Sequence, residues 1–521
     1  MKPYNFLKWM PALIIILLPA CSDDFLDVEP AGRLSSDIYP STDEEVLATI
    51  IGVYDLMQWN YGRDWNSAFF AKNLPADDCN AGSSESDQLP YQNLDDFKNE
   101  ADNTVTTAIW EGFYKAINQC NTIIERIEPE NDFREQIIAE AKALRAWNYF
   151  ELVTLYGDVP FFTVNPTSVD DYHKPRTPKE QIYESIESDL IEAIDILPLK
   201  SELEDSHKFR VSKGTAQSIL GKIYLYQEKW NEAHTVLSQV ISSGEYDLEP
   251  NFGDVWKRVG ELGVESVFEV LYTSQEGYDW GNFGWAGEHE SNIHVQLMGP
   301  RSPFFGNLDV LGIIPGWGFN LPTASIGAAF EEMGDNGPRY QATLMSEEEF
   351  IAAGGEINPD TDDDGNPVPA HDYEGYLRLK YVTYSDQTNT SGAAIPELNY
   401  TTNWRLIRYA DVLLMAAEAY NEDDDEASAR VELNKVRARA ELATYDSPMS
   451  KEELREAIKK ERQLELAFEG SRYWDLIRWG DAAEVLGPLG FVAGKHEHFP
   501  IPQTEISSNN AITQEDQNPG F

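Results

Sequence analysis

Apolar residues recur every three or four positions over several long stretches of the chain, which is the spacing of one face of an α-helix. Ser41 opens a capping-box type start, and Gly157 and Gly470 stand where helices should end. The spacing predicts helices at about 41–57, 105–128, 133–156 and 178–196, a pair of helices within 213–243, and a second helical region from 404 to about 468. The chain is therefore predicted to be mainly α-helical.

Some of these helices have the pattern of tetratricopeptide repeats, in which paired helices approach closely through small residues. Leu220-Gly221 and Tyr224 fit a first repeat helix, and Ala233 and Leu237 fit the second. A degenerate copy lies at Ala416-Ala417, Tyr420, Ala429 and Leu433, and a looser one at Trp110, Phe113 and Ile117. We expect a helical-repeat scaffold.

Helical periodicity fades over residues 244–403, where glycine, proline, asparagine and aromatic residues dominate. Short β-like runs occur there at Glu265–Tyr272 and Tyr376–Tyr384. Loops on a rigid frame are common binding sites. The predicted organisation is a signal peptide, a tether, an N-terminal region with scaffold and ligand loops, an irregular ligand-binding insertion and a C-terminal helical region, with bounds 1–20, 21–40, 41–243, 244–403 and 404–521.

The clearest ligand signal is a set of aromatic residues on glycine-rich loops. The segment Gly277–Gly287 carries Tyr278, Trp280, Phe283 and Trp285; Gly316-Trp317-Gly318 adds another ring, and an earlier loop, 59–104, holds Trp65. Broad rigid rings suit stacking on the C–H face of a sugar, while nearby amides and carboxylates suit its hydroxyls. The predicted glycan-binding residues are Trp65, Asp77, Asp78, Asn80, Tyr278, Trp280, Trp285 and Trp317. Each ring can instead be a core residue beneath a loop, and we expect at least two of Trp65, Tyr278, Trp280, Trp285 and Trp317 to be exposed on one surface.

Near the C-terminus, Glu461 falls inside an apolar helical stripe with Leu454, Ala457 and Leu464. A carboxylate in that position is costly unless it is paired. We therefore predict interior ion pairs that have a structural role, with partners among Arg405, Arg408, Arg472 and Arg478 and further carboxylates at Asp411, Glu418 and Asp475.

The N-terminus has the pattern of a targeting segment. Lys2 and Lys8 precede the apolar run Leu13–Leu18, which is too short to span a bilayer. Leu18-Pro-Ala-Cys21 then predicts cleavage before Cys21 and lipidation of that cysteine, which would anchor the chain; the alternative is an ordinary signal peptide.

The chain is strongly acidic. It has 40 basic and 90 acidic residues among 521, and loss of residues 1–20 leaves 38 basic residues and a formal charge of −52. Such a surface repels nucleic acid and polyanionic ligands at long range. A neutral ligand is therefore favoured over an anionic one.

Other constellations are weaker. Asp360, Asp362 and Asp364 followed by Gly365 form the first half of a calcium loop, but position twelve is His371 rather than Glu, and a solvated acidic turn is the alternative. His289 with His294, and His496 with His498, have spacings compatible with a metal but equally with surface residues. Cys79 and Cys120 allow either a disulfide or two small buried side chains. No phosphate loop, HExxH or GxSxG motif is present, so no cofactor other than calcium is considered.

Six segments, in order, resemble the SusD/RagB family of surface glycan-binding lipoproteins. They are Cys21–Asp27, Arg145–Pro160, Gly316–Thr323, Arg405–Leu414 and Ile458–Trp479, followed by Phe499-Pro-Ile-Pro502. The resemblance implies four tetratricopeptide-like helix pairs, an arc of aromatic residues that holds glycan, an outer-membrane location facing the cell exterior, and a SusC-like TonB-dependent transporter as partner.

The favoured hypothesis is a non-catalytic lipoprotein that binds a neutral polysaccharide or its oligosaccharides, such as a laminarin-type β-glucan, and passes them to that transporter. One alternative is a glycoside-hydrolysing enzyme, since 90 acidic residues leave room for a catalytic pair. Another is a protein-interaction scaffold without glycan binding, since tetratricopeptide arrays usually bind peptides.

Overall fold

The structure is a computed structural model that describes residues 40–521 except 63–64, 286–288 and 362–366. A run of helices forms the scaffold, and each packs against the next in the order α1, α4, α5, α6, α7, α8, α13 and α14. Their bounds are α1 (Asp43–Gly62), α4 (Thr104–Arg126), α5 (Asp132–Tyr156), α6 (Lys179–Ile196), α7 (Lys213–Tyr226), α8 (Trp230–Ser242), α13 (Tyr409–Glu422) and α14 (Glu426–Arg439). The predicted mainly α fold with a helical-repeat scaffold is confirmed.

Two irregular segments interrupt this array. The first joins α1 to α4 and contains α2 (Ala68–Asn73), β1 (Cys79–Gly82) and α3 (Leu89–Asp95). The second joins α8 to α13, and its helices are α9 (Ile293–Met298), α10 (Ala324–Met333), α11 (Pro338–Thr343) and α12 (Glu347–Ala352). Sequence periodicity did not reveal these short helices, because six to ten residues present too few apolar positions to form a repeat.

The strands of the second segment are β2 (Ser266–Val270), β3 (Phe305–Gly306), β4 (Phe319–Pro322), β5 (Leu344–Ser346), β6 (Glu356–Ile357), β7 (Asp360–Thr361), β8 (Pro367–Val368), β9 (Tyr376–Arg378) and β10 (Trp404–Arg408). Across the described residues they form antiparallel pairs rather than a larger sheet: β1–β4, β2–β10, β3–β6, β5–β9 and β7–β8. The β-like runs predicted near 265–272 and 376–384 correspond to β2 and β9. The β1–β4 pair is the one that matters for the site, because it joins the two irregular segments, with Gly82 opposite Phe319.

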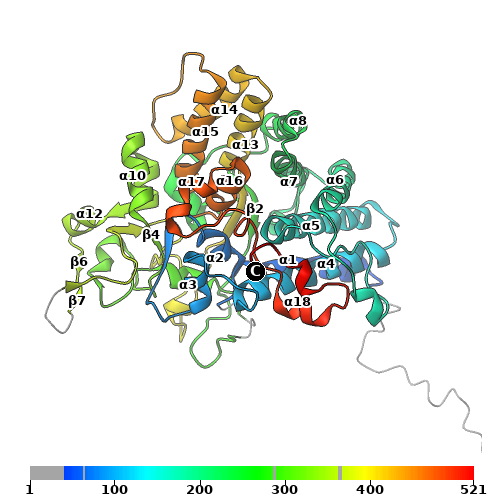
Figure 1. The fold of residues 1–521 in the computed structure, drawn as a ribbon, viewed down its shortest axis with the longest axis horizontal. Helices are drawn as coiled ribbons and strands as arrows, with labels where there is room; N and C mark the ends of the chain where they lie inside the picture. Colours follow the sequence, from blue (N-terminus) through cyan, green and yellow to red (C-terminus); the bar gives the residue numbers. More distant parts are fainter. Residues whose placement is uncertain (1–39, 63–64, 286–288, 362–366) are drawn as a thin grey trace, which may run out of the picture.

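Helices α15 (Lys451–Glu465), α16 (Arg472–Trp479), α17 (Ala482–Val485) and α18 (Gln503–Ser508) complete the chain. In Figure 1, α4 to α8 lie on the right, α13 to α15 lie at the top, and α10, α12 and β6 of the second segment lie on the left. Helix α15 ends at Glu465, before the predicted end near Phe468, and Gly470 takes a positive φ of 78° in the turn that follows.

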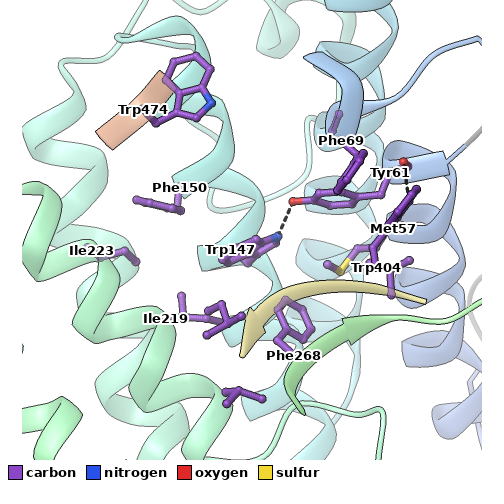
Figure 2. Close-up of a cluster of buried hydrophobic side chains, with 14 of the residues drawn as sticks. Met57, Tyr61, Phe69, Trp147, Phe150, Ile219, Ile223, Phe268, Trp404 and Trp474 are labelled. Carbon is purple, nitrogen blue, oxygen red and sulfur yellow. Dashed lines mark hydrogen bonds between the residues drawn. The ribbon is translucent and has the colours of Figure 1, made fainter. Parts of the chain in front are cut away.

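The main hydrophobic core joins the scaffold to both irregular segments (Figure 2). Trp404 of β10 stacks on Phe69 of α2 with ring centroids 3.9 Å apart, and its indole N–H donates to the Tyr61 carbonyl of α1. The indole N–H of Trp147 on α5 donates to the Tyr61 hydroxyl at 3.2 Å. Each buried polar end of these rings therefore has a partner, which fixes the loops to the helices with a defined geometry.

A buried ion network provides a second attachment. Glu461 on α15 pairs with Arg339 of α11 at 2.5 Å and with Arg437 of α14 at 2.8 Å. Glu465, one turn further along, accepts from Arg408 at 2.5 Å and from Arg339 at 3.2 Å. The prediction of interior ion pairs is confirmed, but the partners expected for Glu461 were wrong, because Arg339 comes from a segment more than a hundred residues away.

The arginines that were expected to pair with Glu461 form ion pairs with other acidic residues. Arg472 forms two hydrogen bonds to Asp77, Arg405 lies 3.4 Å from Glu269, and Arg478 pairs with Glu418 and Asp475. The Arg472–Asp77 pair links α16 to the first irregular segment. Cys79 and Cys120 are both free and buried, so no disulfide joins them.

Candidate functional site

Four tryptophans from the two irregular segments gather into one cluster. Trp65 follows α1, Trp280 and Trp285 lie on the loop after β2, and Trp317 lies two residues before the start of β4. We call these four residues the tryptophan cluster. Trp280 and Trp285 are 53% and 36% exposed, whereas Trp65 and Trp317 are partly buried and pack against the main core. The cluster thus has a supported base and an exposed outer part.

The rings are almost parallel. Trp65 lies 6.0 Å from Trp285 with an interplanar angle of 7°, 5.6 Å from Trp317 at 29°, and Trp285 lies 6.3 Å from Trp317 at 21°. The three distances are nearly equal, so the centroids form a triangle; in a single column, the outer rings would be about twice as far apart as neighbours. Trp280 extends the set, 6.5 Å from Trp285 at 17°.

The Gly-Trp-Gly sequence around Trp317 has a steric reason. A Cβ on Gly316 would lie 2.3 Å from the Cα of Gly299, and Gly318 adopts a positive φ of 76°. The main-chain N–H groups of all three residues donate to the 296–300 segment, at Gln296, Gly299 and Pro300. Only glycine tolerates both constraints, and the result is an indole held in place by its own backbone.

The loop that carries Trp280 and Trp285 is held by hydrogen bonds to Asn399 and by bonds among its own polar groups. Asn399 accepts from the Tyr278 N–H and donates to the Tyr278 carbonyl, each at 2.8 Å. Asp279 accepts from the N–H groups of Gly281 and Asn282, and the Asn282 side chain accepts from the Asp279 N–H. Phe283 contacts Trp285 edge to face at 4.9 Å. These contacts pre-organise the exposed rings and so reduce the entropy lost when a ligand binds.

Trp65 is held in place by contacts with Tyr91 and Phe319. The Tyr91 hydroxyl donates to the Trp65 carbonyl, and the Trp65 ring packs on Phe319 of β4 at 6.0 Å. Ser67 caps α2 by accepting from the Phe70 N–H and donates to the Tyr61 carbonyl. The ring therefore sits between the start of α2 and the β1–β4 pair, where the two irregular segments meet.

The expected exposure of at least two rings on one surface is confirmed by Trp280 and Trp285, which also contact each other. The prediction for Tyr278 is corrected. Its ring is buried against Phe283, and its hydroxyl accepts from the Glu290 N–H. Tyr278 supports the loop from inside, since the Asn399 clamp turns this part of the segment inward.

Asp77 and Asp78 are also corrected, because both are buried. Asp77 is bonded to Arg472, and Asp78 accepts from the Phe468 N–H at 3.1 Å. Burial, together with the charge of the neighbouring Asp77 carboxylate, raises the pKa of Asp78 to about 6. Asn80 is partly exposed and donates to Glu374 and to the Asp372 carbonyl, so its amide is already engaged.

Three predicted residues, Cys21, Asp362 and Asp364, lie outside the described residues. Asp360 is exposed in β7. Within the part of the chain that the structure describes, no group of three or more His, Cys, Asp or Glu residues is arranged to hold a metal. His294 packs edge to face on Phe70, and burial lowers its pKa to about 3, which keeps the ring neutral.

Arg301 is a candidate that the sequence did not indicate. Its Cβ lies 2.8 Å from the position a Cβ on Gly318 would take, and its guanidinium donates to the Ser83 hydroxyl at 2.7 Å. Arg301 therefore lies beside Gly318, the residue that follows Trp317, with its guanidinium bonded to Ser83. Nothing in the local sequence marks Arg301 as a candidate, because its partner Ser83 is brought close to it only by the pairing of β1 with β4.

Known proteins share this architecture. Residues 312–490 match the SusD family, and residues 24–225 match a family described as starch-binding and associating with the outer membrane. A SusD-like protein of Formosa agariphila is 28% identical, with 96% of each chain covered. A laminarin-binding SusD-like protein of known structure is 33% identical with a TM-score of 0.81, covering 92% of this chain and 99% of the other.

A second structure is surface glycan-binding protein A from Bacteroides thetaiotaomicron in complex with laminarihexaose. It is 27% identical, with a TM-score of 0.76, and covers 92% of this chain and all of its own. Fold and sequence together define a SusD-like helical-repeat protein with a long irregular insertion. The chain belongs to the SusD/RagB family.

Proposed function

We propose that this protein binds a neutral glycan at the cell surface and that the tryptophan cluster is the binding face. The observation that carries the proposal is the near-parallel arrangement of Trp65, Trp285 and Trp317, with Trp280 beside them. Sugar rings present flat C–H faces and lose little entropy when they lie against rigid aromatic surfaces. The pre-organised loop supplies that rigidity.

A laminarin-type β-glucan is the favoured ligand. Two structural relatives are named for laminarin or are bound to laminarihexaose, and they resemble this chain over more than nine-tenths of its length. The formal charge of −50 also disfavours alginate and sulfated polymers at long range. A neutral glucan experiences no such repulsion.

We further propose that the protein is a non-catalytic lipoprotein of the outer membrane, anchored through Cys21 and facing the exterior. One of the matching families is described as associating with the outer membrane. No helix among the described residues is both long and apolar enough to cross a membrane. The bound glycan then passes to a SusC-like TonB-dependent transporter, a partner that the family resemblance implies.

Isothermal titration of the mature chain against laminarin, starch, alginate and a sulfated glycan tests the binding proposal. We expect heat with laminarin and none with the anionic polymers. Absence of binding to every neutral glucan contradicts the proposal. A reducing-end assay on the same mixtures separates binding from hydrolysis, because an enzyme generates new reducing ends and a binding protein does not.

The transfer proposal needs a separate experiment. A tagged chain expressed in its own host is solubilised gently and purified, with a Cys21→Ala variant as the matched control. We expect a TonB-dependent transporter to co-purify with the lipidated chain and the Cys21→Ala variant to leave the membrane fraction. A lipidated chain that purifies without any transporter contradicts the partnership.

A further inference from the structure

A polar pocket opens beside the segment that leads into the tryptophan-bearing loop. It has a volume of about 440 Å³, within the range of about 300–1,000 Å³ typical of ligand sites. Every side chain that lines it ends in a polar group, and most are hydroxyls or amides. The residues used below are Arg258, Glu261, Ser274, Gln275, Asn389 and Thr401. We call it the polar pocket.

Thr401 gives the first indication of a ligand. It is 7% exposed and lines the pocket, yet its hydroxyl has no hydrogen-bond partner among the described residues. Buried hydroxyls in folded proteins almost always have a partner. A group that enters the pocket and both donates and accepts hydrogen bonds would satisfy it.

Glu261 gives the second indication of a ligand. One of its carboxylate oxygens accepts from the Asn403 N–H at 3.0 Å, which fixes the side chain at the pocket. Burial raises the pKa of Glu261 to about 6, partly offset by the charge of Arg405. At neutral pH it is therefore mainly an ionised acceptor, able to take hydrogen bonds from ligand hydroxyls.

The pocket lies a short distance along the chain from the proposed binding face. The main-chain carbonyl of Ser274, a residue in the pocket wall, accepts from the Asn389 side-chain amide at 2.8 Å and from the Gly277 N–H at 3.2 Å. Gln275 is exposed and precedes Trp280 by five residues, a separation of at most about 18 Å along an extended chain. A ligand several units long that lies on the tryptophan cluster is thus close to the pocket.

The lining chemistry selects the ligand. A sugar hydroxyl is both donor and acceptor, and Thr401, Glu261 and Arg258 offer a hydroxyl, an acceptor and a donor. An apolar side chain of a peptide would leave these groups unpaired, and the Glu261 carboxylate disfavours an acidic sugar. The pocket therefore fits a single neutral sugar unit.

We propose that the polar pocket is a second subsite, which holds one neutral sugar unit of the glycan whose other units lie on the tryptophan cluster. This inference rests on the proposed function and extends it. The cluster recognises the faces of sugar rings, whereas the pocket reads their hydroxyl groups. Recognition of the glycan by the pocket then depends on chain length, because only a ligand long enough to reach both places contacts it.

The test is isothermal titration with linear β-1,3-glucan oligosaccharides of increasing length, using wild-type protein, Thr401→Val and Glu261→Gln. We expect wild-type affinity to step up once the oligosaccharide reaches the pocket. Each variant should lose about tenfold in affinity for ligands above the step, the worth of one or two hydrogen bonds, and bind shorter ones as wild type does. Thr401→Ser keeps the hydroxyl and should retain the step, while Thr235→Val on the exposed surface of α8 is the matched control.

Equal affinities of wild type and both variants at every length overturn the inference, and so does a loss that is the same for short and long ligands. Folding is checked by the thermal midpoint, and Thr401→Ser with Glu261→Gln keeps the test decisive if the valine variant does not fold. Failure of the underlying proposal looks different: wild-type protein then binds no glucan of any length, or Trp285→Ala binds as well as wild type.

Discussion

Replacing Trp285 by alanine should weaken glycan binding more than any other single ring deletion in the exposed part of the cluster. Trp285 contacts Trp65, Trp280, Phe283 and Trp317, so its ring joins the exposed edge of the cluster to its supported base. Trp280 contacts only Trp285 among the other three tryptophans of the described cluster. Loss of Trp285 therefore removes both a stacking surface and the support of its neighbour.

The magnitude follows from the area that a sugar covers. An aromatic side chain buries about 150–250 Å² when fully enclosed, and a sugar on one face covers roughly a third of that. At about 25 cal/mol per Å², this is roughly 1.3–2 kcal/mol, or about 10–30-fold in Kd. Disorder of Trp280 adds to the loss, so the estimate is a lower bound.

The assay is isothermal titration with laminarihexaose, and the control is Tyr172→Ala. Tyr172 is 56% exposed, comparable to Trp280, but lies on a turn after α5, outside the cluster. We expect Tyr172→Ala to bind as wild type does and to show the same thermal midpoint as Trp285→Ala. Undiminished affinity of a folded Trp285→Ala variant refutes the reasoning, because among the described residues Trp285 is the tryptophan that joins Trp280 to Trp65 and Trp317.

Three further predictions concern the frame that holds the site. Glu465→Ala removes a buried acid that pairs with Arg339 and Arg408, which leaves the buried network one negative charge short, and should lower the free energy of unfolding by about 3–5 kcal/mol in urea titrations. The exposed pair partner Glu456→Ala should cost less than about 1 kcal/mol, and equal effects of the two variants would contradict an interior network. Burial raises the folded-state pKa of Asp95 to about 8, so the folded state binds a proton more tightly than the unfolded chain and loses stability as pH rises from about 4 to about 8. The Asp95→Asn variant should therefore raise the thermal midpoint at pH 8 and much less at pH 5. A shift of the same size at both pH values would argue against that pKa. Gly318→Ala strains a backbone at positive φ and should displace Trp317, with about a tenfold loss of laminarihexaose affinity. The control Gly334→Ala, at a similar φ with open space around it, should lower stability and leave the affinity unchanged. A matching affinity loss in Gly334→Ala would show the effect to be non-specific.

Much of the scaffold follows from sequence because its signals are local. The stripe spacing that defines α5 and α7 repeats over three or more turns, and both helices begin at a capping side chain: Asn131 accepts from the Arg134 N–H, and the Ser212 hydroxyl accepts from the Thr215 N–H. The helix pairs then pack against their neighbours in chain order, which is the contact pattern a repeat implies. Long-range contacts are not needed to predict this part of the fold.

The site was only partly predictable, because burial of its residues depends on distant segments. Glycine-rich composition indicated that Trp280 and Trp285 lie on a surface loop. The interior positions of Asp77 and Asp78 depend on Arg472 and Phe468, almost four hundred residues away. Arg339 likewise reaches Glu461 from the second irregular segment. No spacing rule encodes such pairs in a single sequence.

The crystal structure of the mature chain with laminarihexaose tests the central claim most directly. The account predicts density for consecutive sugar rings lying flat against Trp285 and its near-parallel neighbours Trp65 and Trp317. Density for the hexasaccharide at another surface, with the tryptophan cluster bare, would contradict it.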